Sequence, residues 1–246
     1  MNTFKTRRTI RKYSDREVSN ELLNEILATA MRAPTCGNMQ LYSVVVTRSE
    51  EGKKALAPAH FNQPMVTQAP VVLTVCADFN RFTRWCSLRN ADAGYDNFIS
   101  LVSAVADASI YAQQVVAIAE EQGLGTCYLG TVAYNAPQVA EVLDLPTLVV
   151  PVACITLGWP EGEGEETERL PLEAIVHEEK YREDSDERIL ELFAEKEAYP
   201  ANKGYVEENG KENLAQVFTD VRYTRQANEH FSAIALDYLR QTGFLK

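Results

Sequence analysis

A long apolar segment rich in small side chains, residues 97–122, restricts the possible folds of this chain more than any other feature. Its alanines are Ala104, Ala106, Ala108, Ala112, Ala117 and Ala119. Small side chains at this spacing let a second helix or a sheet approach closely, and Gly123 is suited to end the helix. Its polar residues include Ser100, Ser103, Asp107, Gln113 and Gln114. Because they interrupt the roughly 20 apolar residues that a membrane-spanning helix needs, we predict a buried helix of a soluble protein and no membrane contact.

Hydrophobic patterns predict the elements on either side of this helix. A first helix is expected over residues 19–33, capped by Ser19 and ended by Pro34, because its apolar residues fall on one face. Strands are expected over residues 43–47, 71–77, 126–129 and 149–157. Residues 71–77 are apolar enough for a central strand.

The second half of the chain is predicted to be mainly helical. Helices are expected over residues 137–143, with Asn135 as cap, and over 184–193 and 214–239. Surface loops are expected at 161–168, which is acidic, and at 200–213, which is rich in Gly, Asn and Lys. This order of elements predicts an α+β fold rather than regular alternation of strand and helix.

The composition limits the class of protein. At 246 residues and 46% hydrophobic, the chain can bury one sizeable core. Its five cysteines are scattered without a CxxC pair, and its three histidines are far apart in sequence. We therefore predict reduced thiols, a cytoplasmic location and no metal site.

A basic segment at residues 5–12 stands out because the whole chain has a net charge of -11. Its cations are Lys5, Arg7, Arg8, Arg11 and Lys12, and no acidic residue follows before Asp15. A cationic spot on so negative a chain favours a small anionic ligand, since a polyanion would be repelled. Arginine donors match phosphate oxygens, and Thr9 adds a hydroxyl, so a cofactor bearing a phosphate is the first hypothesis. A nucleic-acid-binding arm is the alternative, whereas a twin-arginine export signal would need an apolar stretch next.

Three further motifs can carry chemistry. Residues 33–40 form a short polar turn whose Asn38 and Gln40 amides can each donate and accept, as recognition of a heterocycle edge requires. The glycine pattern at 123–130 is GxGxxxxG and follows a helix, so it is not a dinucleotide fingerprint. Ordinary readings of these two remain open: a turn that ends a helix, and a helix cap that runs into a strand. The third motif, 157–171, ends near Arg169, which can equally be a solvated ion-pair partner.

Taken together and in this order, the motifs at 7–13, 34–40, 123–130 and 157–171 resemble the FMN-dependent nitroreductase family. Shorter motifs at 76–81, 176–178 and 236–239 are similar to its oxygen-insensitive NADPH nitroreductase and flavin reductase branch. The resemblance extends from about residue 4 to residue 245. It implies a single nitroreductase-like domain, with a core over about 1–180 and a C-terminal helical extension over about 181–246. It also implies a central, mainly antiparallel sheet flanked by helices, and an intertwined homodimer.

The resemblance also implies a role for each segment. The FMN phosphate and ribityl end would be held by Arg7, Arg8, Thr9 and Arg11. The turn of the partner subunit would contact the ring or ribityl chain through Thr35, Cys36, Gly37, Asn38 and Gln40. Gln63 would lie near the flavin, Arg169 would return to the phosphate, and one flavin face would lie along Tyr128, Leu129, Gly130 and Thr131.

This sequence departs from the family pattern at three places. Thr167 stands where the branch usually has a lysine, which puts one phosphate contact in doubt. The turn has Thr35-Cys36-Gly37-Asn38 instead of a run of serines. Thr131 replaces a second glycine that many members have after Gly130. We expect these differences to change cofactor affinity without loss of the flavin.

The activity implied by the resemblance is two-electron, ping-pong reduction of a small oxidised acceptor, nitroaromatic or quinone-like, with NADPH or NADH as donor. Positive charge near flavin N1 would favour the anionic reduced form. No side chain is predicted as a catalytic acid or base. Three alternatives stay open: a flavin reductase that releases reduced FMN, a flavin-binding protein without turnover, and a nucleic-acid-binding module.

Overall fold

The computed structural model describes residues 4–246, which form two compact units. The first unit extends to Glu165 and includes Phe231–Lys246, and the second comprises Glu166–His230. Each unit is described by itself.

The first unit is built on a four-stranded sheet. Its strands are β1 (Tyr42–Thr47), β2 (Val71–Asp78), β3 (Gly125–Leu129) and β4 (Val149–Gly158). They lie in the order β1-β2-β4-β3, and every neighbouring pair is antiparallel. Every residue of β2 is buried, as expected for a central strand covered on both faces. The predicted antiparallel sheet and its four strands are confirmed.

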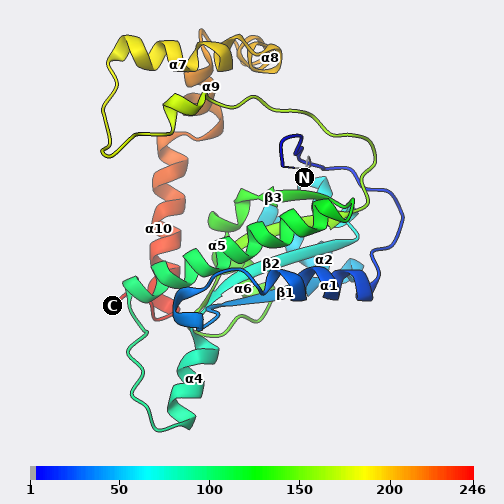
Figure 1. Cartoon of the computed structure of the whole chain (residues 1–246), viewed down its shortest axis with the longest axis vertical. Coiled ribbons are helices and arrows are strands. Elements are labelled where there is room, and N and C mark those ends of the chain that lie inside the picture. Colours follow the sequence, from blue (N-terminus) through cyan, green and yellow to red (C-terminus); the bar gives the residue numbers. More distant parts are fainter. Residues whose placement is uncertain (1–3) are drawn as a thin grey trace. The chain divides into compact units, whose positions relative to one another are not determined.

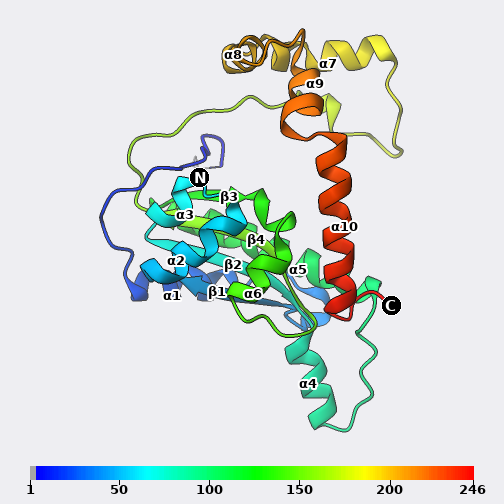
Figure 2. The same ribbon diagram turned by 180° about the vertical axis from the view of Figure 1, so that it is seen from behind.

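Helices cover both faces of this sheet (Figures 1 and 2). One face is covered by α1 (Asn20–Ala30) and α5 (Phe98–Glu121). The other face is covered by α2 (Glu50–Leu56), α3 (Pro64–Gln68) and α6 (Ala136–Val142). Because side chains alternate along a strand, Leu73 of β2 joins the core under α1 and α5, whereas Val72 joins the core of the opposite face.

The central helix α5 agrees closely with its prediction. The Asn97 side chain accepts a hydrogen bond from Ser100 N, and Gly123 takes the left-handed conformation (φ 83°) that ends a helix. Its inner face packs on the sheet, while Phe98 and Ile99 remain 61% and 69% exposed. By length and composition alone, α5 is also the one helix among residues 4–246 that could cross a membrane.

Two helix boundaries show how far local sequence determines a cap. Ser19 accepts a hydrogen bond from Leu22 N, so the predicted cap of α1 is confirmed. Asn135 precedes α6, but its side chain does not cap it. Instead Asn135 Nδ2 donates to Ala59 O at 2.8 Å, because this carbonyl oxygen lies close to it in the fold. The prediction of Asn135 as a side-chain cap is therefore wrong.

The C-terminal helix α10 (Arg225–Gln241) ends against the sheet of the first unit. Leu148 N donates to Thr242 O, and Tyr238 OH donates to Val149 O. The predicted continuous helix over 214–239 is broken: α9 (Leu214–Val217) leads into a π turn at Phe218–Arg222 before α10 begins. The patterns also did not predict α2, α3 or α4 (Asn80–Leu88).

The second unit contains α7 (Asp186–Ala198), α8 (Pro200–Glu208) and α9. The loop predicted over 200–213 is wrong for its first nine residues, which form α8. Pro200 suits the first turn of a helix, and the buried Asn202 donates to both Glu168 Oε1 and Lys196 O. These tertiary contacts outweigh the weak helix propensity of the segment.

Candidate functional site

The basic segment lies as an extended strip along the edge strand β3. Ile10 N donates to Thr126 O at 2.9 Å, and isolated bridges join Thr9 to Glu165 and Tyr13 to Pro160. The Ile10 side chain is buried, whereas Arg11 and Lys12 are exposed. The strip is therefore held by its backbone and its apolar side chains, which leaves cationic heads at the surface.

Glycine at position 125 is what lets this strip approach β3. A Cβ atom at Gly125 would lie 2.6 Å from Ile10 Cβ, closer than any real contact. Gly164 serves the opposite side of the strip, since it is left-handed (φ 72°) and a Cβ there would lie 2.8 Å from Ile10 Cδ1. At Gly125 and Gly164, therefore, the absence of a side chain makes room for the strip.

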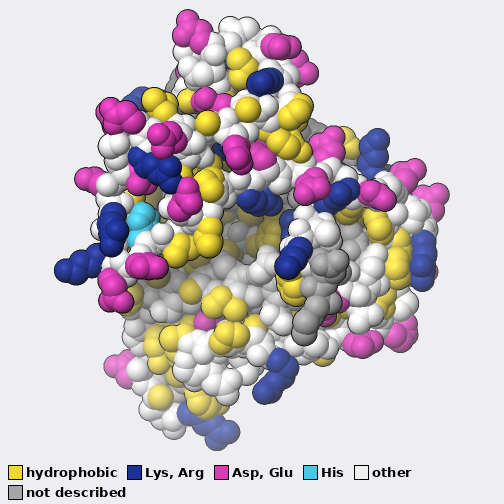
Figure 3. All heavy atoms as spheres, turned by 45° about the horizontal axis from the view of Figure 1, so that its top comes forward, with side chains coloured by type: hydrophobic (Ala, Val, Ile, Leu, Met, Phe, Trp, Pro, Cys, Tyr) yellow, Lys and Arg dark blue, Asp and Glu magenta, His cyan; other side chains and the backbone are white. Residues whose placement is uncertain are grey.

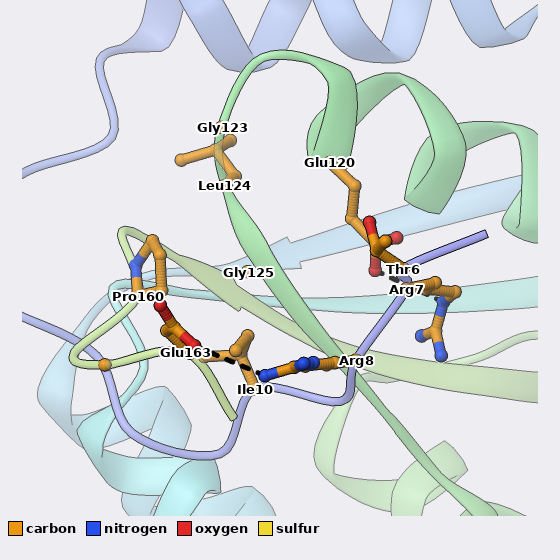
Figure 4. A pocket seen from close by; sticks show the side chains of 11 residues that line it. Thr6, Arg7, Arg8, Ile10, Glu120, Gly123, Leu124, Gly125, Pro160 and Glu163 are labelled. Carbon is orange, nitrogen blue, oxygen red and sulfur yellow. Dashed lines mark hydrogen bonds and ion pairs between the residues drawn. The ribbon is translucent and has the colours of Figure 1, made fainter. Parts of the chain in front are cut away.

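Two arginines of the strip already face carboxylates (Figure 4). Arg7 Nε lies 3.3 Å from Glu120 Oε1, which also accepts from Thr126 Oγ1 at 2.6 Å. Arg8 Nη1 lies 3.4 Å from Glu163 Oε2. No acidic residue adjoins the strip in sequence before Asp15, but two carboxylates adjoin it in space. Burial raises the pKa of Glu120, so its charge is costly there without Arg7.

The two pairs differ in strength. The Glu163 side chain is 91% exposed, and such pairs contribute about 0–1 kcal/mol; Arg8 Nη1 also donates to Gly164 O at 3.4 Å. The side chains of Arg7 and Glu120 are 24% and 15% exposed, and their contact is less screened. Arg7 is thus better suited to fasten the strip than to bind a ligand.

Cavities lie on both sides of the strip. One of about 430 Å³ is lined by Arg7, Arg8 and Glu120 among others (Figure 4). A second of about 440 Å³ is lined by residues of the strip and of the loop after β4: Thr9, Ile10, Arg11, Lys12, Glu161, Gly164 and Glu165. The second cavity brings a hydroxyl and two cations together as phosphate donors, beside the carboxylates of Glu161 and Glu165.

The opposite end of β3 offers an open, uncharged surface. Tyr128 is 38% exposed and Leu129 is buried, and a Cβ at Gly130 would meet nothing within 4 Å. A cavity of about 370 Å³ lies here between β3, β4 and the α5 residues Ser109 and Gln113. Partial burial raises the pKa of Tyr128 to about 12, so this surface stays neutral at physiological pH.

Thr131 and Gln63 meet at a buried histidine that the sequence did not single out for a role. His60 Nδ1 lies 2.8 Å from Thr131 Oγ1, and Gln63 N donates to His60 O. His60 is fully buried, its Nε2 has no hydrogen-bond partner within the described residues, and burial lowers its pKa to about 4. The hydroxyl at 131, where many family members would have glycine, is therefore used to satisfy a neutral imidazole.

Asp107 of α5 holds the 35–40 turn through hydrogen bonds to its backbone. Cys36 N donates to Asp107 Oδ1 at 2.8 Å, and Leu41 N donates to Asp107 Oδ2 at 3.2 Å. Within the turn Gln40 N donates to Thr35 Oγ1. In the sequence, Asp107 is recognisable only as a polar interruption of an apolar helix. Its signal was a charge in the middle of a segment otherwise suited to burial.

Arg81 of α4 supports the same turn from a second side. Its Nη2 donates to Gln40 O at 2.6 Å and to Tyr42 O at 3.0 Å. Its Nη1 donates to Ser43 Oγ and to Asp78 Oδ2. The motif at 76–81, first noted for its resemblance, thus has a physical role in holding the start of β1.

The turn and the strip lie far apart within one chain. The turn contacts α5 at Asp107 and Arg7 contacts it at Glu120, thirteen residues later, which at 1.5 Å per residue is about 20 Å along the helix. The structure therefore brings the strip to one end of β3 and Gln63, Gly130 and Thr131 to the other, but places the turn elsewhere. Arg169 belongs to the second unit, where its Nη1 donates to Thr167 Oγ1 at 2.6 Å and to Glu168 O at 2.8 Å.

The surface shown in Figure 3 has lysines and arginines interspersed with aspartates and glutamates. No broad basic patch suited to a polyanion is visible on this face. Within residues 4–246, no three His, Cys, Asp or Glu side chains form a group that could hold a metal ion. The cysteines of this part of the chain are all free thiols.

Comparison with known proteins gives consistent results. The sequence profile of the Nitroreductase family matches residues 4–159. An FMN reductase [NAD(P)H] of Bacillus subtilis is 35% identical over 209 residues, which cover 83% of this chain and 82% of that protein. An oxygen-insensitive NADPH nitroreductase of Salmonella typhimurium is 32% identical over 188 residues, which cover 76% of this chain and 76% of that protein. A crystal structure of a Bacteroides fragilis protein has a TM-score of 0.98 and 52% identity, with 100% of both chains covered.

Proposed function

The chain belongs to the nitroreductase family, and we propose that it is an FMN-dependent oxidoreductase that uses NADPH or NADH to reduce nitroaromatic or quinone-type acceptors. The observation that carries this proposal is the arginine strip fastened along β3, with phosphate-binding donors at one end of the strand and the open surface of Gly130 at the other. The relatives bearing the names FMN reductase and NADPH nitroreductase support it.

The residues present fit such a cofactor. Thr9, Arg11 and Lys12 line one cavity, beside Glu161 and Glu165, and Arg8 adds a cation whose Glu163 partner is exposed. From Thr126 to Leu129 the strand rises about 10 Å at 3.3 Å per residue, which separates a charged end from an uncharged one. A nucleotide with an anionic tail and a flat ring matches this polarity.

Bound FMN would supply the redox chemistry, accepting a hydride from the nicotinamide and passing two electrons to the acceptor. The chain's residues would bind and orient. Arg8, Thr9 and Arg11 would hold the phosphate and ribityl end, and Arg11 would add positive charge near the ring. Tyr128, Leu129, Gly130 and Thr131 would lie along one ring face, with Gln63 beside them. No side chain need transfer a proton.

We propose that the 35–40 turn reaches the flavin of a second copy in a homodimer. The α5 helix supports this, because its outer face is apolar as well as its inner one: Phe98, Ile99, Val102 and Ile110 are 42–69% exposed. A helix that is apolar all round is normally covered on both sides. A second copy would cover this face, and a cytoplasmic location agrees with the free cysteines.

Preference for NADPH would depend on a cation for its 2′-phosphate. Four candidates lie in the second unit, and three of them have partners there: Lys211 pairs with Asp220, Arg225 pairs with Glu229, and Arg222 lies over the Tyr205 ring. Lys203 is exposed and has no such side-chain partner within the described residues. Lys203 is therefore our candidate for this contact.

An absorption spectrum of purified protein tests the proposal. We expect bound flavin, bleaching under anaerobic NADPH or NADH, and return of colour when a quinone or nitroaromatic is added. Protein that remains colourless and takes up no added FMN would refute the cofactor, and bound flavin that NAD(P)H cannot bleach would instead favour a binding protein without turnover. Because relatives are named FMN reductase, free FMN should also be tried as acceptor, and turnover that scales with it would favour flavin release.

A further inference from the structure

Asp107 is a buried carboxylate in a helix that is otherwise suited to an apolar core. It is 3% exposed, and both its oxygens accept backbone hydrogen bonds from the two ends of one turn, Cys36 N and Leu41 N. A buried carboxylate is costly unless its oxygens are satisfied in this way. Its position is thus explained by the turn and not by the packing of α5.

Only a carboxylate can hold both ends of this turn at once. An asparagine at 107 would have a single acceptor oxygen, and its NH₂ group would face the other backbone N–H. The nearly isosteric change Asp107→Asn would therefore release one end of the turn and leave two donors opposed. This makes it a sharp test that barely alters side-chain volume.

The turn needs such support because its backbone is unusual. Gly37, Asn38 and Gln40 all adopt left-handed conformations, with φ of 55°, 56° and 54°. Glycine and asparagine adopt this conformation readily, whereas at Gln40 it persists only where the surroundings determine it. Asp107 holds the turn from inside, and Arg81 binds the Gln40 carbonyl from the surface. The result is a shape fixed in advance.

The fixed turn presents its side chains outward. Asn38 is exposed, Gln40 is half-buried, and their amides hydrogen-bond to each other at 3.3 Å. On the next turn of α5 after Asp107, Ile110 belongs to the exposed apolar face that a second copy would cover. The turn and that face are thus joined through one helix.

We propose that Asp107 is a positioning residue, assisted by Arg81, which fixes the 35–40 turn in the shape that completes the flavin site of a second copy. This inference rests on the proposed function. A turn fixed before assembly loses less conformational freedom when it closes over the cofactor, so it strengthens binding without a contact of its own. Asp107 therefore acts on the site of the partner and not on that of its own chain.

Mixed dimers test this directly. One tagged chain carries Arg8→Ala and Arg11→Ala, which damage the strip, and a differently tagged chain carries Asp107→Asn, which loosens the turn. In a heterodimer one site combines both defects, while the other combines an intact strip with an intact turn. Co-expression, purification through both tags and measurement of bound FMN by absorbance give the result without any activity assay.

We expect each variant homodimer to bind FMN at least about tenfold more weakly than wild type, the loss expected for one hydrogen bond to a charged group. The heterodimer should recover one tightly bound FMN per dimer. Arg81→Gln should act in the same direction as Asp107→Asn; because its side chain is 56% exposed, it also serves if Asp107→Asn fails to fold. Glu121→Gln, an exposed charge on the same helix, is the matched control and should bind as wild type does.

The outcomes separate this inference from the proposed function. Wild-type protein without FMN would overturn both. Wild type that binds FMN, with Asp107→Asn and Arg81→Gln unchanged in affinity, would overturn the positioning role alone. A heterodimer that recovers no site, or a tandem purification that yields no heterodimer, would show that the turn does not act across subunits.

Discussion

Replacing His60 by asparagine should make the protein less sensitive to acid. His60 is fully buried, and burial lowers its pKa from 6.5 to about 4, because a charged imidazole would lose its hydration. In the unfolded chain the same side chain binds a proton near pH 6.5. Between these values the unfolded state binds more protons, so acid favours unfolding. The contribution of neutral, buried His60 to the free energy of unfolding is complete above pH 6.5, and it is lost as the pH falls towards 4.

The size of the effect follows from the shift. A difference of about 2.5 units at 1.36 kcal/mol per unit gives up to about 3 kcal/mol, of which about 2 kcal/mol is already lost at pH 5. Asparagine removes the titration and keeps a polar group near the position of Nδ1, where Thr131 Oγ1 lies. Any cavity that it leaves lowers stability equally at all pH values. The two proteins are therefore compared by how steeply the free energy of unfolding changes with pH, and not by its absolute value.

Urea unfolding at pH 8 and pH 5 measures these slopes. Both tryptophans, Trp85 and Trp159, belong to the first unit with His60, so their fluorescence reports on the relevant unfolding. We expect wild type to lose about 2 kcal/mol more than His60→Asn between the two pH values. His177→Asn, which removes an imidazole from the second unit, controls for the loss of a histidine elsewhere. Equal pH dependence in wild type and His60→Asn would refute the argument.

Three further changes test other parts of the site. Gly125→Ala should cost about 1–3 kcal/mol in urea unfolding, because the new Cβ would overlap Ile10, and wild-type stability would show that the strip can shift. Arg11→Ala should lower the FMN content of purified protein, and unchanged content would remove Arg11 from the site. Lys203→Ala should raise the KM for NADPH several-fold and leave that for NADH unchanged, whereas equal effects on both would exclude a 2′-phosphate contact.

Much of the fold could be predicted because its signals are local. The small-residue helix, its Asn97 cap and its Gly123 end are all encoded within a few residues, and so are the four apolar strands. The failures arise where distant contacts decide. The segment at 200–208 contains Pro200, Asn202 and Gly204, which disfavour a helix, yet it is helical where Asn202 reaches Glu168. Asn135 has a capping side chain, yet it bonds to Ala59 instead.

The candidate site shows the same limit more sharply. Composition identified the arginine strip, because a cluster of cations is visible along the chain. The acids that face it were hidden, since Glu120 and Glu163 lie more than a hundred residues away in sequence. Proximity along the chain therefore indicated the type of ligand but not which arginines are free to bind it. Arg7 fastens the strip through the partly buried Glu120, whereas the Glu163 partner of Arg8 is exposed.

Asp107 illustrates what a sequence can still indicate when it cannot supply the contact. A charge in the middle of an apolar helix must be exposed, paired or bonded to backbone, and the sequence alone does not choose among these. In the structure the Asp107 carboxylate is bonded to the backbone of the turn. The neighbouring apolar residues of α5 are the ones that remain exposed. Helix α5 buries the Asp107 charge and exposes hydrophobic side chains, which is the reverse of what is expected at a surface that faces only water. That inversion is why we expect the missing half of the site to come from a second copy.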